Sequence, residues 1–390
     1  MADKINAFYG AGAEFSAGNT FTSSEIAQQP EIWRALGGVL KTEKTGVQTF
    51  LGKLGNPDNI RIILTGAGSS AYAGEAAAAA LGKEGLHCEA IATTDIVSSP
   101  YSVLLPNVPT LLVSFARSGN SPESSQALKY ARGIVKNLYE LAIVCDGSSA
   151  LAKLTRESSK GFCLVMPEGS NDKGFAMTSS ITSMIIACFV VFSASPLDDL
   201  CRDIENLAGT IEKHSAELSS LARKWAAHDY KRLIVLGSGS CKGLAREAAL
   251  KSMELSAGAV NTNYESAMGF RHGPKAVIND STLTIHFISP DPLTSKYDKD
   301  LLNEIIRQKK GNRIISLSAI PLAEKADEGI TINTVYKTSP ELFSGLSFLV
   351  FCQMLAMFKS QNLGFAVDNP VPGGELTRIV SGVTNYDLKG

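Results

Sequence analysis

RIILTGAGSS, residues 61–70, recurs later in the chain as RLIVLGSGSC, residues 232–241. Each copy is an apolar run that ends in a glycine-rich turn, as where a strand leads into a helix. The offset is constant at 232 − 61 = 171, and two glycines and a serine match across it. The matched pairs are Gly66 with Gly237, Gly68 with Gly239 and Ser69 with Ser240. This repeat predicts an internal duplication.

Short apolar runs alternate with helical segments in both halves, which is typical of parallel βαβ units. A helical, charge-bearing stretch, residues 196–228, separates two series of five expected strands. These are residues 61–65, 87–93, 110–115, 140–145 and 162–166, and then 232–236, 260–264, 283–288, 313–318 and 330–335. The sequence therefore predicts an α/β protein with two tandem doubly wound, flavodoxin-like, parallel five-stranded sheets flanked by helices.

The same pattern divides the chain into four parts. We expect an N-terminal segment with its helix (1–45), a first domain (46–205), a second domain (206–365) and a C-terminal tail (366–390). Residues 1–20 are rich in Gly and Ala, so we expect them to be loosely held.

The first helix has a candidate start and stop. Thr22 and Glu25 are spaced as in a capping box, and Pro30 should stop or kink this helix. A longer helix should run from about Pro30 toward Leu54.

Composition excludes several classes of function. The net charge is −1, from 37 basic and 38 acidic residues, so no global field attracts nucleic acid or anionic lipid. The apolar runs 183–194 and 342–358 are short or interrupted, which favours buried packing helices over membrane spans. We expect no signal peptide, because MADKINAFYGAG lacks a basic region followed by an apolar core, and the seven scattered cysteines favour buried, reduced thiols in a cytoplasmic protein.

The stretch TLLVSFARSGNSPE, residues 110–123, ends an expected strand in small hydroxyl residues. Such a loop can surround an anion with N–H groups and hydroxyls, and the helix that is capped near Ser121 and opens at Pro122 directs its positive end inward. The loops after the first and third strands meet where such sheets bind ligands. Together they predict a phosphate site made by Ser69, Ser70, Arg117, Ser118 and Ser121.

Other interpretations of these loops remain open. The third-strand loop could be an ordinary polar connection, and GAGSSA with Glu89 could be half of a dinucleotide fingerprint. In the second half the equivalent loop is SPDPLTSK, residues 289–296, where two prolines remove N–H donors and Asp291 would repel an anion. We therefore expect one phosphate site per chain.

The second half holds the catalytic candidates. Helical spacing puts Lys251 one turn from Glu254 and one turn from Glu247, so these side chains could point together into a crevice. Spacing alone equally allows a solvated surface pair. His272, in FRHGPKAV, is a further candidate, although a lone loop histidine is often structural. No HExxH-type ligand spacing and no GxSxG motif occurs, so we expect neither a metal centre nor a serine hydrolase.

The motifs GAGSSA, ARSGNSPE, AREAALKSMEL and ESAMGFRHGPKAVI follow one another in a duplicated α/β chain. In this order they resemble the sugar isomerase (SIS) family over residues 20–390. The chain is similar to the isomerase half of glucosamine-6-phosphate synthases and closer to the bacterial galactosamine-6-phosphate deaminases, long labelled tagatose-6-phosphate ketose/aldose isomerases. The resemblance implies an isomerising deaminase that converts galactosamine 6-phosphate and water to tagatose 6-phosphate and ammonia.

The resemblance also assigns roles in the cradle. Ser70, Ser118 and Ser121 match phosphate-binding positions of the family. Arg117 stands in place of a glutamine and Ala116 in place of a serine, so the cradle loses a hydroxyl and gains a cation. An arginine can hold phosphate bidentately, which could compensate.

The remaining roles concern the chemistry. Glu254 matches the glutamate that moves a proton between C1 and C2, and Lys251 matches a lysine near the sugar. His272 matches a ring-opening histidine that comes from the neighbouring subunit, which implies a homodimer or a higher homo-oligomer with a shared active site. Arg378 stands where the related tail carries a catalytic-site lysine.

Two other functions fit the same motifs. One is ketose/aldose isomerisation of a hexose 6-phosphate without deamination, and the other is a non-catalytic regulator that senses a sugar phosphate. The expected partner in every case is a small sugar phosphate, with no cofactor, no nucleic acid and no membrane.

Overall fold

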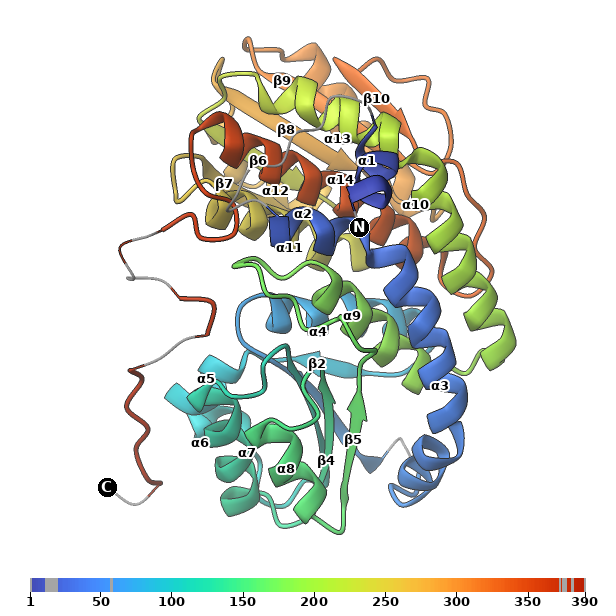
Figure 1. Ribbon diagram of the computed structural model, residues 1–390, viewed down its shortest axis with the longest axis vertical. Coiled ribbons are helices and arrows are strands. Elements are labelled where there is room, and N and C mark those ends of the chain that lie inside the picture. Colours follow the sequence, from blue (N-terminus) through green and yellow to red (C-terminus); the bar gives the residue numbers. More distant parts are fainter. Residues whose placement is uncertain are drawn as a thin grey trace. The chain divides into compact units, whose positions relative to one another are not determined.

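The computed structural model describes residues 2–10, 20–56, 59–371, 373, 377–379 and 382–388. The chain folds as two compact units, each built on one sheet (Figure 1). The first-sheet unit comprises Ala35–Asp172, Ser179–Ala194 and Gly373–Gly390, and the second-sheet unit comprises Met1–Arg34, Lys173–Thr178 and Ser195–Pro372. The domain boundaries predicted from the sequence stay predictions.

The first sheet is all parallel, in the order β2-β1-β3-β4-β5. Helices α4 and α9 cover one face of this sheet (Figure 1). Helices α7 and α8 cover the other face, and α5 and α6 lie beside α7. The strands are β1 (Arg61–Thr65), β2 (Cys88–Ala90), β3 (Thr110–Ala116), β4 (Leu138–Val144) and β5 (Gly161–Val165). The helices are α4 (Ser69–Lys83), α5 (Thr93–Ser98), α6 (Pro100–Val103), α7 (Pro122–Ile134), α8 (Ala150–Glu157) and α9 (Ser179–Phe192).

The second sheet repeats this winding in the order β10-β9-β8-β6-β7, again all parallel. Helices α11 and α14 pack together on one face, with α10 against α14, and α13 packs with α12 on the other. The strands are β6 (Arg232–Leu236), β7 (Asn261–Glu265), β8 (Thr282–Phe287), β9 (Arg313–Ser318) and β10 (Glu328–Thr331). The helices are α10 (Leu197–Ala226), α11 (Ser240–Leu255), α12 (Ala267–Phe270), the 3-10 helix η2 (Pro274–Val277), α13 (Thr294–Arg307) and α14 (Pro340–Asn362).

The predicted fold class is confirmed, and all ten strands lie near their predicted positions. Two strands are shorter than predicted. The first is β2, only three residues long. The second is β10, which ends at Thr331, so residues 332–335 of the predicted strand lie outside it.

The repeated turn has the same backbone in both halves. Gly68 has φ 56° and precedes α4, and Gly239 has φ 59° and precedes α11. A positive φ of this kind favours glycine. A Cβ on Gly66 would lie 2.5 Å from the backbone of Ser70, so the strand and helix can approach this closely only without a side chain there. The turn therefore brings a helix N-terminus to the carboxyl edge of each sheet.

The N-terminal region corrects two expectations. Residues 2–9 form α1 (Ala2–Tyr9), and Tyr9 is fully buried with its hydroxyl donating to the carbonyl of Ser23 at 2.7 Å, so this part is not loosely held. The predicted capping box is also wrong, because α2 (Thr20–Ala27) starts before Thr22. Glu25 instead accepts from the backbone N–H groups of Lys173 and Gly174. Residues 11–19 lie outside the described residues.

Helix α2 ends at Ala27 and α3 (Gln29–Gly52) begins two residues later. The break predicted at Pro30 therefore lies slightly earlier, at Gln28, and Pro30 is the second residue of α3. Helix α14 is long and apolar enough to cross a membrane by length and composition, but every residue of its apolar window is buried inside the protein. It is placed as a packing helix, as the interrupted pattern predicted.

All seven cysteines are free, but not all are buried as expected. Four are buried and three are half-buried, the latter being Cys88, Cys163 and Cys201.

One buried histidine stands out in the second sheet. His286 lies on β8 with no exposed surface, and neither of its ring nitrogens has a hydrogen-bond partner among the described residues. It pairs in register with Ser316 of β9. Burial lowers the pKa of His286 to about 3, with the charge of Arg271 contributing. The side chain is therefore neutral in the folded protein.

This histidine makes stability depend on pH. The folded pKa is lower than the ordinary value of 6.5, so the unfolded chain binds a proton that the folded chain does not. The contribution of His286 is complete above pH 6.5 and is lost as pH falls toward 3. Between pH 7.5 and 5.5 this loss should be about 1.4 kcal/mol. Urea unfolding of the protein at the two pH values measures it.

Replacement of His286 by either Phe or Leu should reduce the pH-dependent loss by that amount. The two replacements differ in volume and so in overall stability, but they share the absence of a titrating group. An unchanged pH-dependent loss in both variants would contradict the assignment.

Candidate functional site

The predicted phosphate cradle lies within the first-sheet unit, at the carboxyl ends of the neighbouring strands β1 and β3. Ser69 and Ser70 are the first two residues of α4, and both are buried. The positive end of a helix dipole therefore lies at this edge of the sheet. The strand order reverses between β1 and β3, which is where open α/β sheets bind ligands.

The loop after β3 brings the other predicted cradle residues to the same edge. Ser121 directly precedes α7 and makes no side-chain capping bond, while Pro122 takes the first helical position. The hydroxyl of Ser118 accepts a long hydrogen bond of 3.4 Å from the N–H of Asn120. Gly119 has φ 62°, and a Cβ there would meet the Ser149 side chain. The loop thus depends on its glycine to keep this path.

Arg117 and Arg378 are brought together within the first-sheet unit. Arg117 is buried at the end of β3, and its Nη2 donates to the backbone carbonyl of Arg378 at 2.7 Å. The Arg378 guanidinium points elsewhere, since its Nε donates to the carbonyl of Asp172 at 2.7 Å and its Nη2 donates to Asn171 Oδ1 at 2.8 Å. The tail residue Arg378 is therefore fixed beside the cradle arginine.

Asp172 anchors this arrangement to α9. Its carboxylate accepts from the hydroxyl of Ser179 at 2.5 Å and from the N–H and hydroxyl of Ser180 at 2.9 and 2.5 Å. Burial raises the pKa of the nearby Cys145 to about 12, and the charges of Arg117 and Arg378 offset this only in part. The Cys145 thiol is thus not a reactive thiolate at neutral pH.

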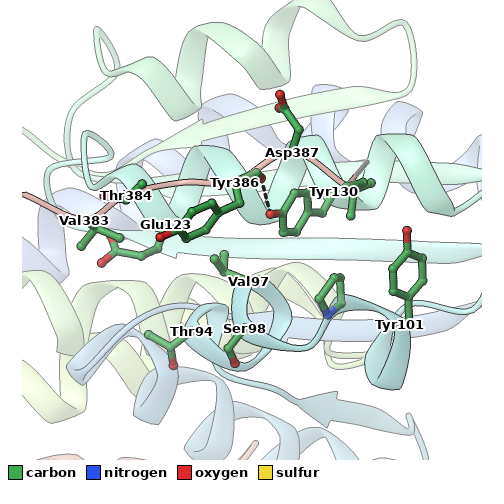
Figure 2. A pocket seen from close by; sticks show the side chains of 12 residues that line it. Thr94, Val97, Ser98, Tyr101, Glu123, Tyr130, Val383, Thr384, Tyr386 and Asp387 are labelled. Carbon is green, nitrogen blue, oxygen red and sulfur yellow. Dashed lines mark hydrogen bonds between the residues drawn. The ribbon is translucent and has the colours of Figure 1, made fainter. Parts of the chain in front are cut away.

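A groove of about 600 Å³ lies beside the tail, lined by α5, α6, α7 and residues 383–388 (Figure 2). The Tyr386 carbonyl accepts from Gln126 Nε2 at 3.0 Å and from the Tyr130 hydroxyl, the bond dashed in Figure 2. None of the predicted site residues is among its lining residues. Side chains of α7 thus hold the tail through its main-chain carbonyl at Tyr386. The groove shares no lining residue with the predicted phosphate cradle.

The alternative dinucleotide interpretation needs Glu89 to be available for a ribose, but Glu89 is paired with an arginine. Glu89 on β2 accepts from Arg61 Nε at 2.6 Å and Nη2 at 2.7 Å, and Arg61 is the first residue of β1. The carboxylate is therefore paired at the start of the strand instead of facing its carboxyl end.

The catalytic candidates of the second-sheet unit lie on α11. Lys251 and Glu247 are each 1% exposed, and Lys251 Nζ lies 2.5 Å from Glu254 Oε2 and 3.3 Å from Glu247 Oε1. The Glu254 side chain is 24% exposed. The solvated surface pair that spacing allowed is therefore wrong, because one buried ammonium holds two carboxylates of which only Glu254 reaches solvent.

His272 is not joined to this triad by any contact among the described residues. It lies exposed in the turn after α12, and its backbone N–H donates to the carbonyl of Gly269 at 3.0 Å. Gly273, with φ 121°, and η2 follow it. An exposed position suits a side chain that acts on a neighbouring copy, as the resemblance implied.

Glu341, near the start of α14, is a buried carboxylate that no sequence pattern singled out. Its Oε1 accepts from the N–H and the hydroxyl of Ser240 at 2.8 Å each, and its Oε2 accepts from Ser289 Oγ at 2.6 Å. Asp291, which was expected to repel an anion here, accepts from the backbone N–H groups of Leu293 and Thr294 just at the start of α13. A lone carboxylate in the first turn of a long apolar helix was the available signal.

Among the residues that the structure describes, no group of three or more His, Cys, Asp or Glu side chains could hold a metal ion.

Comparisons with known proteins place these residues in a family. The SIS domain family model matches residues 57–194 and 228–358. A D-galactosamine-6-phosphate deaminase AgaS of Shewanella sp. (strain ANA-3) is 38% identical over 374 residues, which cover 95% of this chain and 92% of that protein. A structure described as a putative tagatose-6-phosphate ketose/aldose isomerase from Clostridium novyi NT superposes with a TM-score of 0.91 at 37% identity, covering 99% and 97% of the two chains.

A more distant relative is the isomerizing glutamine–fructose-6-phosphate aminotransferase of Pyrobaculum aerophilum, 24% identical over 368 residues. These cover 90% of this chain and 56% of that protein. The resemblance drawn from the motifs is thereby confirmed.

The members of the Lys251 triad on α11 should be energetically coupled. Replacement of Lys251 by Met removes the ammonium that faces the buried Glu247 carboxylate, so unfolding should become easier by about 3 kcal/mol. A second change, Glu247→Gln, should recover part of this loss, because it removes the uncompensated charge. Chemical denaturation of the wild type, both single variants and the double variant measures the coupling. Strictly additive effects would contradict it.

Proposed function

The chain belongs to the SIS domain family, and on that premise we propose that it is an isomerising deaminase of a 6-phospho amino sugar. The proposed reaction converts galactosamine 6-phosphate and water to tagatose 6-phosphate and ammonia. The observation that carries the proposal is the triad on α11, in which Glu254 is held by Lys251 and is still accessible. Similarity to the Shewanella deaminase over nearly the whole chain supports the choice of substrate.

The first-sheet unit binds the phosphate in this proposal. The α4 N-terminus, the serines of both loops and the buried Arg117 supply positive potential and hydrogen-bond donors at one edge of the sheet. This binding is largely the same in the ground state and the transition state.

The second-sheet unit supplies the proton transfers. His272 of a neighbouring copy opens the ring by moving a proton between O5 and O1. Glu254 then takes the proton from C2 and returns it to C1 through an enolamine, whose developing charge Lys251 stabilises. The product of this step is an imine at C2, and water hydrolyses it to the ketone and ammonia. Atoms and charge balance without a metal or an organic cofactor.

A second enzymatic function uses the same residues. Ketose/aldose isomerisation of a hexose 6-phosphate needs the same C2-to-C1 proton transfer but no C–N cleavage, and the Clostridium novyi structure carries that description. A purely sensing role would not call for a buried lysine that holds an accessible glutamate.

Ammonia release separates these functions. Purified protein is given galactosamine 6-phosphate, glucosamine 6-phosphate or tagatose 6-phosphate, and ammonia and ketose phosphate are measured. Ammonia in equal amount to tagatose 6-phosphate supports the proposal. Aldose formation from tagatose 6-phosphate with no ammonia from either amino sugar contradicts it in favour of the isomerase.

Glu254→Gln should lower kcat by about 10³-fold or more, because the amide cannot accept the C2 proton. Binding of tagatose 6-phosphate, measured by calorimetry, should stay within about threefold of the wild type because the cradle is intact. Turnover close to that of the wild type would rule out Glu254 as the base.

The same variant tests the shared site. Inactive Glu254→Gln subunits mixed with inactive His272→Ala subunits should regain activity, since each mixed pair has one site with both residues. No recovery after proven subunit exchange would contradict a histidine donated by the partner.

Arg117→Ala should raise KM by about tenfold and leave kcat nearly unchanged, because it removes binding that is equal in the ground and transition states. Arg156→Ala is the matched control, since Arg156 is an exposed arginine of α8 in the same unit. Steady-state kinetics that show a fall in kcat at constant KM would place Arg117 in the chemistry instead of in phosphate binding.

A further inference from the structure

The glycine-rich turn that begins α11 has the geometry of an anion-binding turn, and a carboxylate of the chain itself occupies it. The turn copies the one before α4 in sequence and in backbone angles. Glu341 accepts three hydrogen bonds there, one from the Ser240 N–H and two from the hydroxyls of Ser240 and Ser289. Glu341 is 3% exposed, and the two serines are 0% and 2% exposed.

The two copies differ in what lies against the glycine. A Cβ built on Gly239 would collide with the Glu341 carboxylate, whereas a Cβ on Gly68 would meet no described atom within 4 Å. Strand register also matches the donors. Thr110 pairs with Arg61 in the first sheet and Thr282 pairs with Arg232 in the second, so Thr110 and Thr282 are equivalent positions. Seven residues further on (110 + 7 and 282 + 7), Arg117 in the first half is therefore equivalent to Ser289 in the second. Ser289 thus holds Glu341 at the position where the first half has its cradle arginine.

The carboxylate comes from the helix that packs on the catalytic helix. Helix α14 packs on α11 as α9 packs on α4. Helix α9 begins with Ser179 and Ser180, while the second residue of α14 is Glu341. The carboxylate at this position is therefore a feature of the second half.

A second carboxylate completes the surroundings of the turn. Asp298 of α13 accepts from Ser238 Oγ at 2.6 Å and from the Ser289 N–H at 3.0 Å. Burial raises the pKa of Asp298 to about 6, and the charge of Glu341 adds to this shift. At pH 7.5 Asp298 is mostly ionised. Its negative charge repels a dianionic phosphate more strongly than a singly charged carboxylate, so the turn favours one carboxylate.

We propose that the turn before α11 is an anion-binding site for a small monocarboxylate, and that the Glu341 side chain is its built-in ligand. The bound carboxylate ties the N-terminus of α11 to α14 and satisfies donors that a buried helix end must otherwise leave unpaired. The duplicated phosphate turn has thereby become an internal joint that holds the helix carrying Lys251 and Glu254.

Removal of the side chain should expose the site to acetate. Glu341→Ala deletes Cγ and the carboxyl group, and acetate supplies the same atoms. At pH 7.5 the variant should lose about 5 °C or more in Tm. Acetate should restore most of this loss saturably, while its neutral isostere acetamide should not. Melting curves followed by circular dichroism measure both effects.

Glu84→Ala is the matched control. Glu84 also accepts from a serine hydroxyl and a backbone N–H, those of Ser193 and Ala194, but it is not at a helix N-terminus. Acetate should shift this variant and the wild type only by the small, unsaturable amount that any weakly stabilising salt gives. An additional Ser289→Ala change in Glu341→Ala should weaken the acetate response at least severalfold. Equal acetate responses in Glu341→Ala and Glu84→Ala would overturn the proposal.

If Glu341→Ala is insoluble even when produced with acetate, Glu341→Gln carries the test. The amide keeps the shape but lacks the charge, so Tm should fall measurably, and an unchanged Tm would overturn the proposal. The effect on turnover rests on the proposed function, since acetate should also restore kcat of Glu341→Ala if α11 carries the base. The melting data are independent of that reaction, so failure of the one is distinguishable from failure of the other.

Discussion

The structure depends on one turn that is used twice. A strand ends in Gly-x-Gly, the second glycine takes φ near 60°, and a helix starts at the next residue with its N–H groups at the carboxyl edge of the sheet. A side chain at the first glycine of either turn, Gly66 or Gly237, would collide with the following helix, and one at Gly239 would collide with Glu341. A helix N-terminus fixed in this way attracts negative charge, so each half must bring an anion to its turn.

The two halves meet that requirement differently, and we attribute the division of labour proposed for them to this difference. In the first-sheet unit the turn adjoins a serine loop with a buried arginine, which suits an external phosphate. In the second-sheet unit Glu341 occupies the turn, and the helix behind it carries the buried Lys251 between two glutamates. On the proposed function, a duplicated fold thereby supports one binding half and one chemical half, and the two sheets have the same winding.

Much of the fold was predictable because its signals are local. Apolar runs that end in Gly and Ser gave the strands, and the repeat gave their winding. Long-range contacts were not predictable. Spacing could not tell a buried Lys251 from an exposed one, and Ser240 is 101 positions from Glu341, which fills its turn. Residues 2–9 were wrongly expected to be loosely held for the same reason, since the Tyr9 hydroxyl donates to Ser23 and not to a neighbour in sequence. Arg378 was placed by resemblance alone, and its contact with Arg117 depends on the path of the tail.

The claim at the centre of this account is that each chain has one phosphate-binding half. It is tested most directly by calorimetric titration with galactitol 6-phosphate, which carries the phosphate and the hydroxyls of the proposed product but has no carbonyl to react. The account predicts one equivalent bound per chain. Two equivalents per chain, one for each copy of the turn, would contradict it.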